Sequence, residues 1–167
     1  MRIAKKTIFE RLQLQHLSIN KLIQWGDHFS VDHPTVDAQH KAIFDLGTKV
    51  YENWRAGAGV DALRASVDKV AKLLEVHFAY EEKLLAEIEY LELEQHAREH
   101  DSMLNEIKEI QEYFQSIYDK KEAPGGSVLA PGWSVVQLLL GFTIGHVATS
   151  DMSYYRSLVD SRQDRPQ

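Results

Sequence analysis

The sequence predicts an all-α protein, an antiparallel up-down-up-down four-helix bundle with an N-terminal arm. Apolar residues recur at alternating steps of four and three over four long segments, which is typical of helices buried along one face of a bundle. Short breaks separate the first three segments, and short connections make neighbouring helices antiparallel. The 167 residues suffice for one domain with a substantial core.

We divide the chain into an arm of residues 1–24, a bundle of residues 25–162 and a C-terminal tail of residues 163–167. The arm carries a net charge of +4 and the rest of the chain −10. A basic amphipathic arm can contact a membrane surface or a protein partner. The alternative, which we favour, is an arm packed on the bundle.

A turn-rich segment ends in His33-Pro34, and the residue before a proline is biased away from helix. We therefore expect Asp37 to cap a first helix that runs to about Ala56 and is closed by the glycines that follow. Its predicted buried stripe is Val36, His40, Ile43, Gly47, Val50 and Trp54.

Asp61 is the expected N-cap of a second helix, which a break near residues 88–91 separates from a third helix over about 91–121. The buried stripe of the second helix is Leu63, Val67, Val70, Leu74, His77, Glu81, Leu84 and Ile88. That of the third is His96, His100, Met103, Ile107, Ile110, Phe114 and Ile117.

Residues 123–132 contain two prolines and three glycines and predict a loop, after which a fourth helix runs over about 133–162. Its buried stripe is Val135, Leu139, Phe142, His146 and Thr149. Asp151 leaves this stripe, because five residues along an α-helix turn through about 140°. His146 and Asp151 can share a site only if the helix is distorted, or if the carboxylate reaches a second ion.

A cluster of metal-binding side chains is predicted at one level along the bundle, where the polar positions of the four stripes come together. A single histidine on an apolar face is more often an ordinary core residue than a ligand, but here every helix contributes at least one. Burying so many polar groups without partners would cost about 1–3 kcal/mol each, and metal ions would satisfy them together. The candidate ligands are His40, His77, Glu81, His96, His100, His146 and Asp151.

Seven ligands are too many for one ion and suit two. The chain has no cysteine, so disulfides, thiolate sites and iron–sulfur clusters are excluded, while the mixture of nitrogen and oxygen donors suits iron, manganese or zinc. Two six-coordinate ions that share both carboxylates and an oxo or hydroxo bridge keep one open position, which dioxygen binding requires.

Four motifs, in this order, resemble the hemerythrin family. They are Asp37-Ala-Gln-His40-Lys41, His77-Phe-x-x-Glu81, His96-x3-His100 and His146-x4-Asp151. The resemblance spans roughly residues 25–160 and includes a leading segment, Trp25 to Val31, similar to that of bacterial members. It implies a four-helix bundle around a non-haem di-iron centre that binds dioxygen reversibly.

The resemblance also implies a role for each ligand. His96, His100 and His146 would hold the fully coordinated iron. His40 and His77 would hold the iron with the open position, and Glu81 and Asp151 would bridge the two ions. The implied cofactor is two iron ions per chain with an oxo or hydroxo bridge. The implied role is dioxygen carriage, storage or delivery rather than enzymatic catalysis.

The implied dioxygen pocket is lined by Ile43, Phe78, Phe142 and Thr143. The family usually has Trp-Leu four and three residues before the histidine of the fourth helix, where this chain has Phe142 and Thr143. A threonine can donate a hydrogen bond or admit water, so we expect a more polar pocket.

The sequence supports three alternatives to an oxygen carrier to different degrees. The segment His96-Ala-Arg-Glu99-His100 fits the His-x-x-Glu-His pattern of inverted zinc proteases, but that class leaves the remaining ligands unexplained. Ferritin-like di-iron proteins use Glu-x-x-His pairs, which this chain lacks. A sensor, or an enzyme that reduces NO or peroxide, would use the same site, but no general acid or base is evident beside the open position unless Tyr80 or Thr143 acts as one.

The net charge and the hydropathy limit which other partners and which cellular location we expect. The net charge of −6 argues against nucleic acid as a main partner. No apolar run approaches the ~20 residues of a membrane span, and no apolar signal core follows the basic N-terminus. We therefore expect a cytoplasmic protein.

The substitution Thr143→Leu tests the polar pocket. We expect the wild-type chain, loaded with ferrous iron, to oxidise faster in air than the Thr143→Leu variant, because the threonine hydroxyl admits or holds water near bound dioxygen. The measurement is the rate of autoxidation followed by visible absorbance. Equal rates, or slower oxidation of the wild type, would contradict the prediction.

Overall fold

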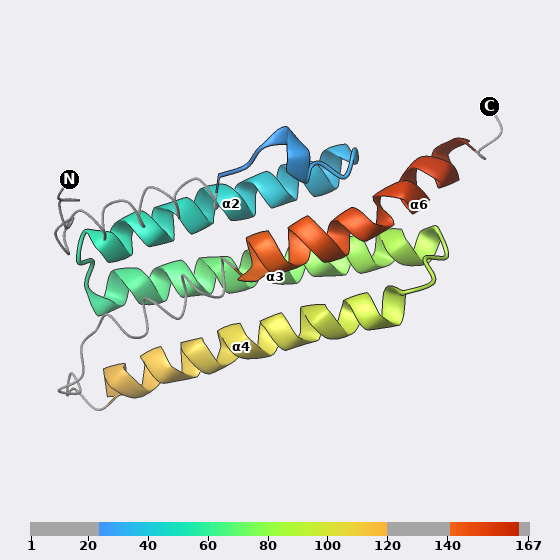
Figure 1. Cartoon of the computed structure of the whole chain (residues 1–167). Helices are drawn as coiled ribbons and strands as arrows, with labels where there is room; N and C mark the ends of the chain where they lie inside the picture. Colours follow the sequence, from blue (N-terminus) through green and yellow to red (C-terminus); the bar gives the residue numbers. More distant parts are fainter. Residues whose placement is uncertain (1–23, 120–140, 164–167) are drawn as a thin grey trace, which may run out of the picture.

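The computed structural model describes residues 24–119 and 141–163, and within them every regular element is helical. Three long helices lie side by side, and a fourth rod made of η2 and α6 lies against them (Figure 1). The predicted all-α four-helix bundle is confirmed. The elements are η1 (Asp27–Phe29), α2 (Pro34–Arg55), α3 (Val60–Glu87), α4 (Leu93–Asp119), η2 (Gly141–Asp151) and α6 (Met152–Gln163).

Several predicted segments lie outside the described residues. They are the arm of residues 1–24 apart from Gln24, the loop 123–132, the first part of the fourth helix before residue 141, and the tail 163–167 apart from Gln163. In the two described ranges, no helix combines the length and the apolar composition that a membrane crossing requires.

The first helix begins earlier than the sequence indicated. α2 starts at Pro34, and the Nδ1 atom of His33, the N-cap, accepts a hydrogen bond from the Val36 backbone at 3.4 Å. Proline suits the first turn because its missing N–H has no partner there in any helix. Asp37, the predicted cap, instead accepts hydrogen bonds from the Ser30 hydroxyl at 2.7 Å and the Val31 backbone at 2.8 Å. Its carboxylate therefore holds the leading segment against α2.

Two similar turns fix the order of the helices. After α2, Gly57 has a φ of 74°, and the next backbone N–H, that of Ala58, reaches the carbonyl of Asn53 at 2.9 Å. After α3, Glu89 has a φ of 54°, and Tyr90 bonds the Leu85 carbonyl at 3.0 Å. Both turns end a helix with a left-handed residue and reverse the chain within a few residues. α2, α3 and α4 are therefore antiparallel neighbours.

The described bundle has a polar layer between two apolar clusters. The larger cluster contains Ile43, Val70, Leu74, Phe114 and others, and the smaller one contains Val31, Val36, Leu85, Tyr154 and Leu158. Along α2 and α3 the buried face passes from one cluster to the other through His40, His77 and Glu81. The predicted ligand stripe therefore interrupts the core at the middle of the bundle.

Truncation of the core next to this layer should destabilise the protein. Leu74 is 1% exposed and lies one turn from His77, so Leu74→Ala should lower the free energy of unfolding by about 3 kcal/mol. Val76→Ala is the control, because Val76 is 55% exposed, and its effect should stay within about 0.5 kcal/mol. Denaturant titration of both variants measures the difference, and equal losses would contradict this packing.

Candidate metal centre

All seven predicted ligands lie together in the middle of the bundle, and none is more than 4% exposed. Each of the four rods contributes at least one of them, as the alignment of the four stripes predicts. The contributions are His40 from α2, His77 and Glu81 from α3, His96 and His100 from α4, and His146 and Asp151 from η2.

The fourth rod brings His146 and Asp151 onto one face, despite their five-residue spacing, because it is not α-helical there. η2 is a π-helix, in which hydrogen bonds run from residue i to i+5. His146 and Asp151 are therefore about one turn apart, and His146 Nε2 lies 3.0 Å from an oxygen of Asp151. Local distortion was one of the two solutions that the sequence left open. The prediction for Thr149 was wrong, because this residue is exposed where the stripe expected burial.

The ligand atoms form two groups that share both carboxylates. In each group all candidate atoms lie within 4.8 Å of one another. One group has three histidines and the other has two, which is the division that the family resemblance implied. The groups are Glu81, His96, His100, His146 and Asp151, and His40, His77, Glu81 and Asp151. That these side chains bind metal remains a prediction.

Glu81 and Asp151 sit between the two groups of histidines. One oxygen of Glu81 is 3.1 Å from both His96 Nε2 and His100 Nε2. The two oxygens of Asp151 divide between the groups, one 3.0 Å from His146 and the other 3.1 Å from His40. Each carboxylate therefore has atoms within reach of both groups, as a bridging ligand needs.

Polar residues behind the histidines determine which ring nitrogen carries the proton. In three cases the Nδ1 atom faces an oxygen that can only accept, so Nδ1 must be the donor. The pairs are His77 with Gln39 at 3.1 Å, His100 with Glu82 at 2.8 Å and His146 with Glu99 at 3.2 Å. In a neutral imidazole the Nε2 lone pair then points into the cluster, and such outer partners orient metal-binding histidines.

This arrangement places hydrogen-bond acceptor atoms of neighbouring histidines next to one another. His100 Nε2 and His146 Nε2 are 2.9 Å apart, although each ring already has a proton on the opposite nitrogen. The Glu81 oxygen 3.1 Å from His100 Nε2 adds a negative charge to the same space. Lone pairs at these distances repel unless a cation, either a proton or a metal ion, lies among them. The donor set and its directions therefore fit metal ions.

The ionisation states also suit metal binding. Burial lowers the pKa of His77 to about 4, against the opposing charge of Glu81. Burial would raise the pKa of Glu81, but polar contacts from His100 and His96 hold it well below its ordinary value. At neutral pH His77 is therefore neutral and Glu81 is ionised, which are the forms that ligate a metal.

In the other half of the cluster, His146 attracts a proton more strongly than a free imidazole does, while Asp151 stays ionised. Burial would lower the pKa of His146, but the polar contact with Asp151 at 3.0 Å and the charge of that carboxylate raise the pKa above its ordinary value. Burial and the charge of Glu81 would raise the pKa of Asp151, yet polar contacts from His146 and His40 keep it low. A metal ion entering this half would displace a proton.

Sequence reasoning missed the residues that support the ligands. Gln39, Glu82 and Glu99 each precede or follow a predicted ligand directly, and this adjacency was the only available signal. Tyr154 is fully buried and donates a hydrogen bond to Glu81. Burial and the charge of Glu81 raise the pKa of this tyrosine well above its ordinary value, so it remains a donor.

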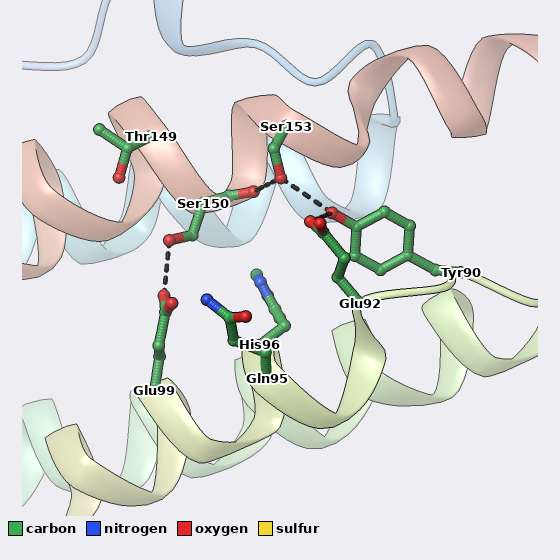
Figure 2. A pocket seen from close by; sticks show the side chains of 8 residues that line it. All are labelled: Tyr90, Glu92, Gln95, His96, Glu99, Thr149, Ser150 and Ser153. Atoms are coloured by element: carbon green, nitrogen blue, oxygen red, sulfur yellow. Dashed lines mark hydrogen bonds between the residues drawn. The ribbon is translucent and has the colours of Figure 1, made fainter.

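Glu99 does not have the position of a protease general base. Its carboxylate accepts hydrogen bonds from His146 Nδ1 at 3.2 Å and from the Ser150 hydroxyl at 2.5 Å. Figure 2 shows Glu99 reaching from α4 towards Ser150 on the fourth rod. The carboxylate therefore orients an imidazole and does not face the space between the ligand nitrogens.

Two of the four predicted pocket residues can be placed. Ile43 is 1% exposed in the core, and the Phe78 ring stacks on His100 with centroids 3.8 Å apart and planes 11° apart. The side chains of Phe142 and Thr143 lie outside the described residues. Trp25, which sequence reasoning did not select for the site, lies against His40 with ring centroids 6.1 Å apart.

Comparison with known proteins agrees with this geometry. The model of the hemerythrin HHE cation binding domain matches residues 32–157. A bacteriohemerythrin of Clostridium acetobutylicum is 33% identical over 87 residues, which cover 50% of this chain and 67% of the relative. A myohemerythrin of Riftia pachyptila is 31% identical over 87 residues, covering 52% and 66% respectively.

A bacteriohemerythrin of Campylobacter jejuni is 30% identical over 81 residues, which cover 48% of this chain and 61% of that protein. The chain thus spans about two thirds of the length of these relatives. The family match covers the entire stretch from the first predicted ligand, His40, to the last, Asp151. The chain belongs to the hemerythrin family.

Proposed function

We propose that this chain holds two iron ions and binds dioxygen reversibly, as a carrier or store. One observation carries the proposal: two groups of inward-directed nitrogens share both of their carboxylates. His96, His100 and His146 would hold one ion, His40 and His77 the other, and Glu81 and Asp151 would bridge. The names bacteriohemerythrin and myohemerythrin of the relatives support the same assignment.

The unequal number of histidines gives the two ions different roles. The group with His40 and His77 has one protein ligand fewer than the group with three histidines, so a position for an external ligand would lie there. When bound, the iron pair supplies the electrons that reversible dioxygen binding requires. The chain contributes nitrogen and oxygen donors without thiolate, a combination that suits iron.

The surrounding residues would keep the site dry and its charges balanced. Ile43 and Phe78 belong to the large apolar cluster next to the ligands, and an apolar wall excludes the water that promotes loss of electrons from the metal. Tyr154 donates a hydrogen bond from its hydroxyl to Glu81, so the carboxylate charge has a buried partner as well as the ions. These features suit stable binding of a small neutral gas rather than turnover.

Metal analysis with optical spectroscopy tests the proposal. The reduced protein should contain two irons per chain, develop a visible band in air, and lose it when the gas is removed.

His40→Leu should bind about one iron and give no reversible band, because the two-histidine group loses a ligand while the other keeps three. His28→Ala, at an exposed position of η1, should retain both irons. One zinc ion and no colour in the wild type would overturn the proposal, and rapid peroxide or NO turnover would favour an enzyme.

The outer hydrogen bonds should set metal affinity. Glu82→Leu removes the acceptor 2.8 Å from His100 Nδ1, and loss of such a partner weakens metal binding by roughly 10- to 100-fold. Glu82→Gln keeps an acceptor oxygen and should lose much less. Glu75→Leu, at an exposed position on the same helix, controls for the added apolar surface. Competition with a chelator measures the affinities, and equal values for the two Glu82 variants would contradict this role.

A further inference from the structure

A polar cavity of about 210 Å³ lies on the surface beside the candidate metal centre. It opens between the start of α4 and the fourth rod (Figure 2). Its lining contains two carboxylates and several hydroxyl groups but no lysine or arginine. The lining residues are Tyr90, Glu92, Gln95, His96, Glu99, Thr149, Ser150 and Ser153. A cavity with this charge concentrates cations and repels anions.

His96 forms the wall between this cavity and the ligand cluster. The residue is 96% buried, and its Nε2 atom lies 3.1 Å from a buried oxygen of Glu81. The same ring lines the cavity, between Glu92 and Glu99 in Figure 2. One imidazole therefore touches both the outer cavity and the inner site.

His96 also differs from His77, His100 and His146 in how it is held. The Nδ1 atoms of His77, His100 and His146 are tied to acceptors at 2.8–3.2 Å. In the described part of the chain, His96 Nδ1 has no acceptor within hydrogen-bonding distance. This ring can therefore turn without breaking an outer hydrogen bond. Of the remaining ligands, only His146 is exposed to the same small extent.

We propose that this cavity is the uptake vestibule for the metal ions and that His96 is the ligand that swings to admit them. A hydrated divalent cation would first meet the carboxylates of Glu92 and Glu99 and the hydroxyl of Ser153. Rotation of His96 would open the wall, and the ring would close behind the ion as its ligand. The inference rests on the proposed metal centre.

Substitutions along an entry route and substitutions of a metal ligand have different effects on the rates of metal uptake and release. Changing the route alters uptake and release by the same factor and leaves the equilibrium affinity unchanged. Glu92→Gln removes one charge at the mouth, where the side chain contacts only the Tyr90 hydroxyl at 3.1 Å among described residues. Gln95→Phe fills the cavity from an exposed helical position. Glu94→Gln and Glu94→Phe are matched controls, because Glu94 is 94% exposed and does not line the cavity.

The experiment follows Co²⁺, which gains visible absorption when it takes nitrogen ligands, into metal-free protein of each variant at low and high salt. Release from the loaded protein to excess chelator is measured in parallel and does not require a folded metal-free state. Glu92→Gln should slow uptake and release roughly three- to ten-fold at low salt, with a smaller effect at high salt. Gln95→Phe should slow both at either salt concentration, while Kd stays the same and the Glu94 controls behave as wild type.

Unchanged rates in both cavity variants would overturn the vestibule and leave the metal centre intact. A changed Kd with unchanged uptake would also overturn it, by assigning these residues to the support of the bound state. Wild-type protein that takes up no Co²⁺ and contains no iron would overturn the metal centre itself.

Discussion

The repulsion among buried lone pairs is the constraint on which the rest of this structure depends. His100 and His146 bring their Nε2 atoms to 2.9 Å with the ring protons on the opposite side, and the carboxylates of Glu81 and Asp151 add two buried charges. No packing of apolar side chains relieves this repulsion, and positive charge does. The apolar clusters on either side therefore enclose a layer whose stability depends on what occupies it.

The outer hydrogen bonds that support this layer are unevenly distributed among the histidines. Gln39, Glu82 and Glu99 hold three imidazoles from behind, while His96 lacks such a partner among the described residues. In the proposed centre, the ligands held from behind would preserve the geometry of two closely spaced ions. A ligand that turns, as proposed for His96, would let the ions enter after the bundle has formed. A site held equally on all sides would bind well and fill slowly.

The repeated steps of four and three predicted α2, α3 and α4, and no described residue of their stripes is exposed, although five are only partly buried. This worked because burial on a regular α-helix follows directly from residue spacing. The start of α2 was not predicted, because Asp37 had two possible hydrogen-bonding roles and only the folded chain shows which one it takes. Thr149 was misplaced since the stripe assumed an α-helix through a segment that is a π-helix. Tyr154 and the outer acceptors depend on how the helices are rotated about one another, which spacing along one chain does not specify.

The π-helical segment η2 changes the direction in which later side chains of the fourth rod point. η2 continues directly into α6, and its wider turn sets the angular position of the residues that follow it. Tyr154, three residues after Asp151, faces Glu81 only because of that change in direction. The length of the segment between His146 and Asp151 therefore matters more than its composition. Point substitutions at Ala148 or Thr149, both exposed, leave this direction intact, whereas insertion or deletion of one residue would turn Asp151, Tyr154 and Leu158 away from the bundle together.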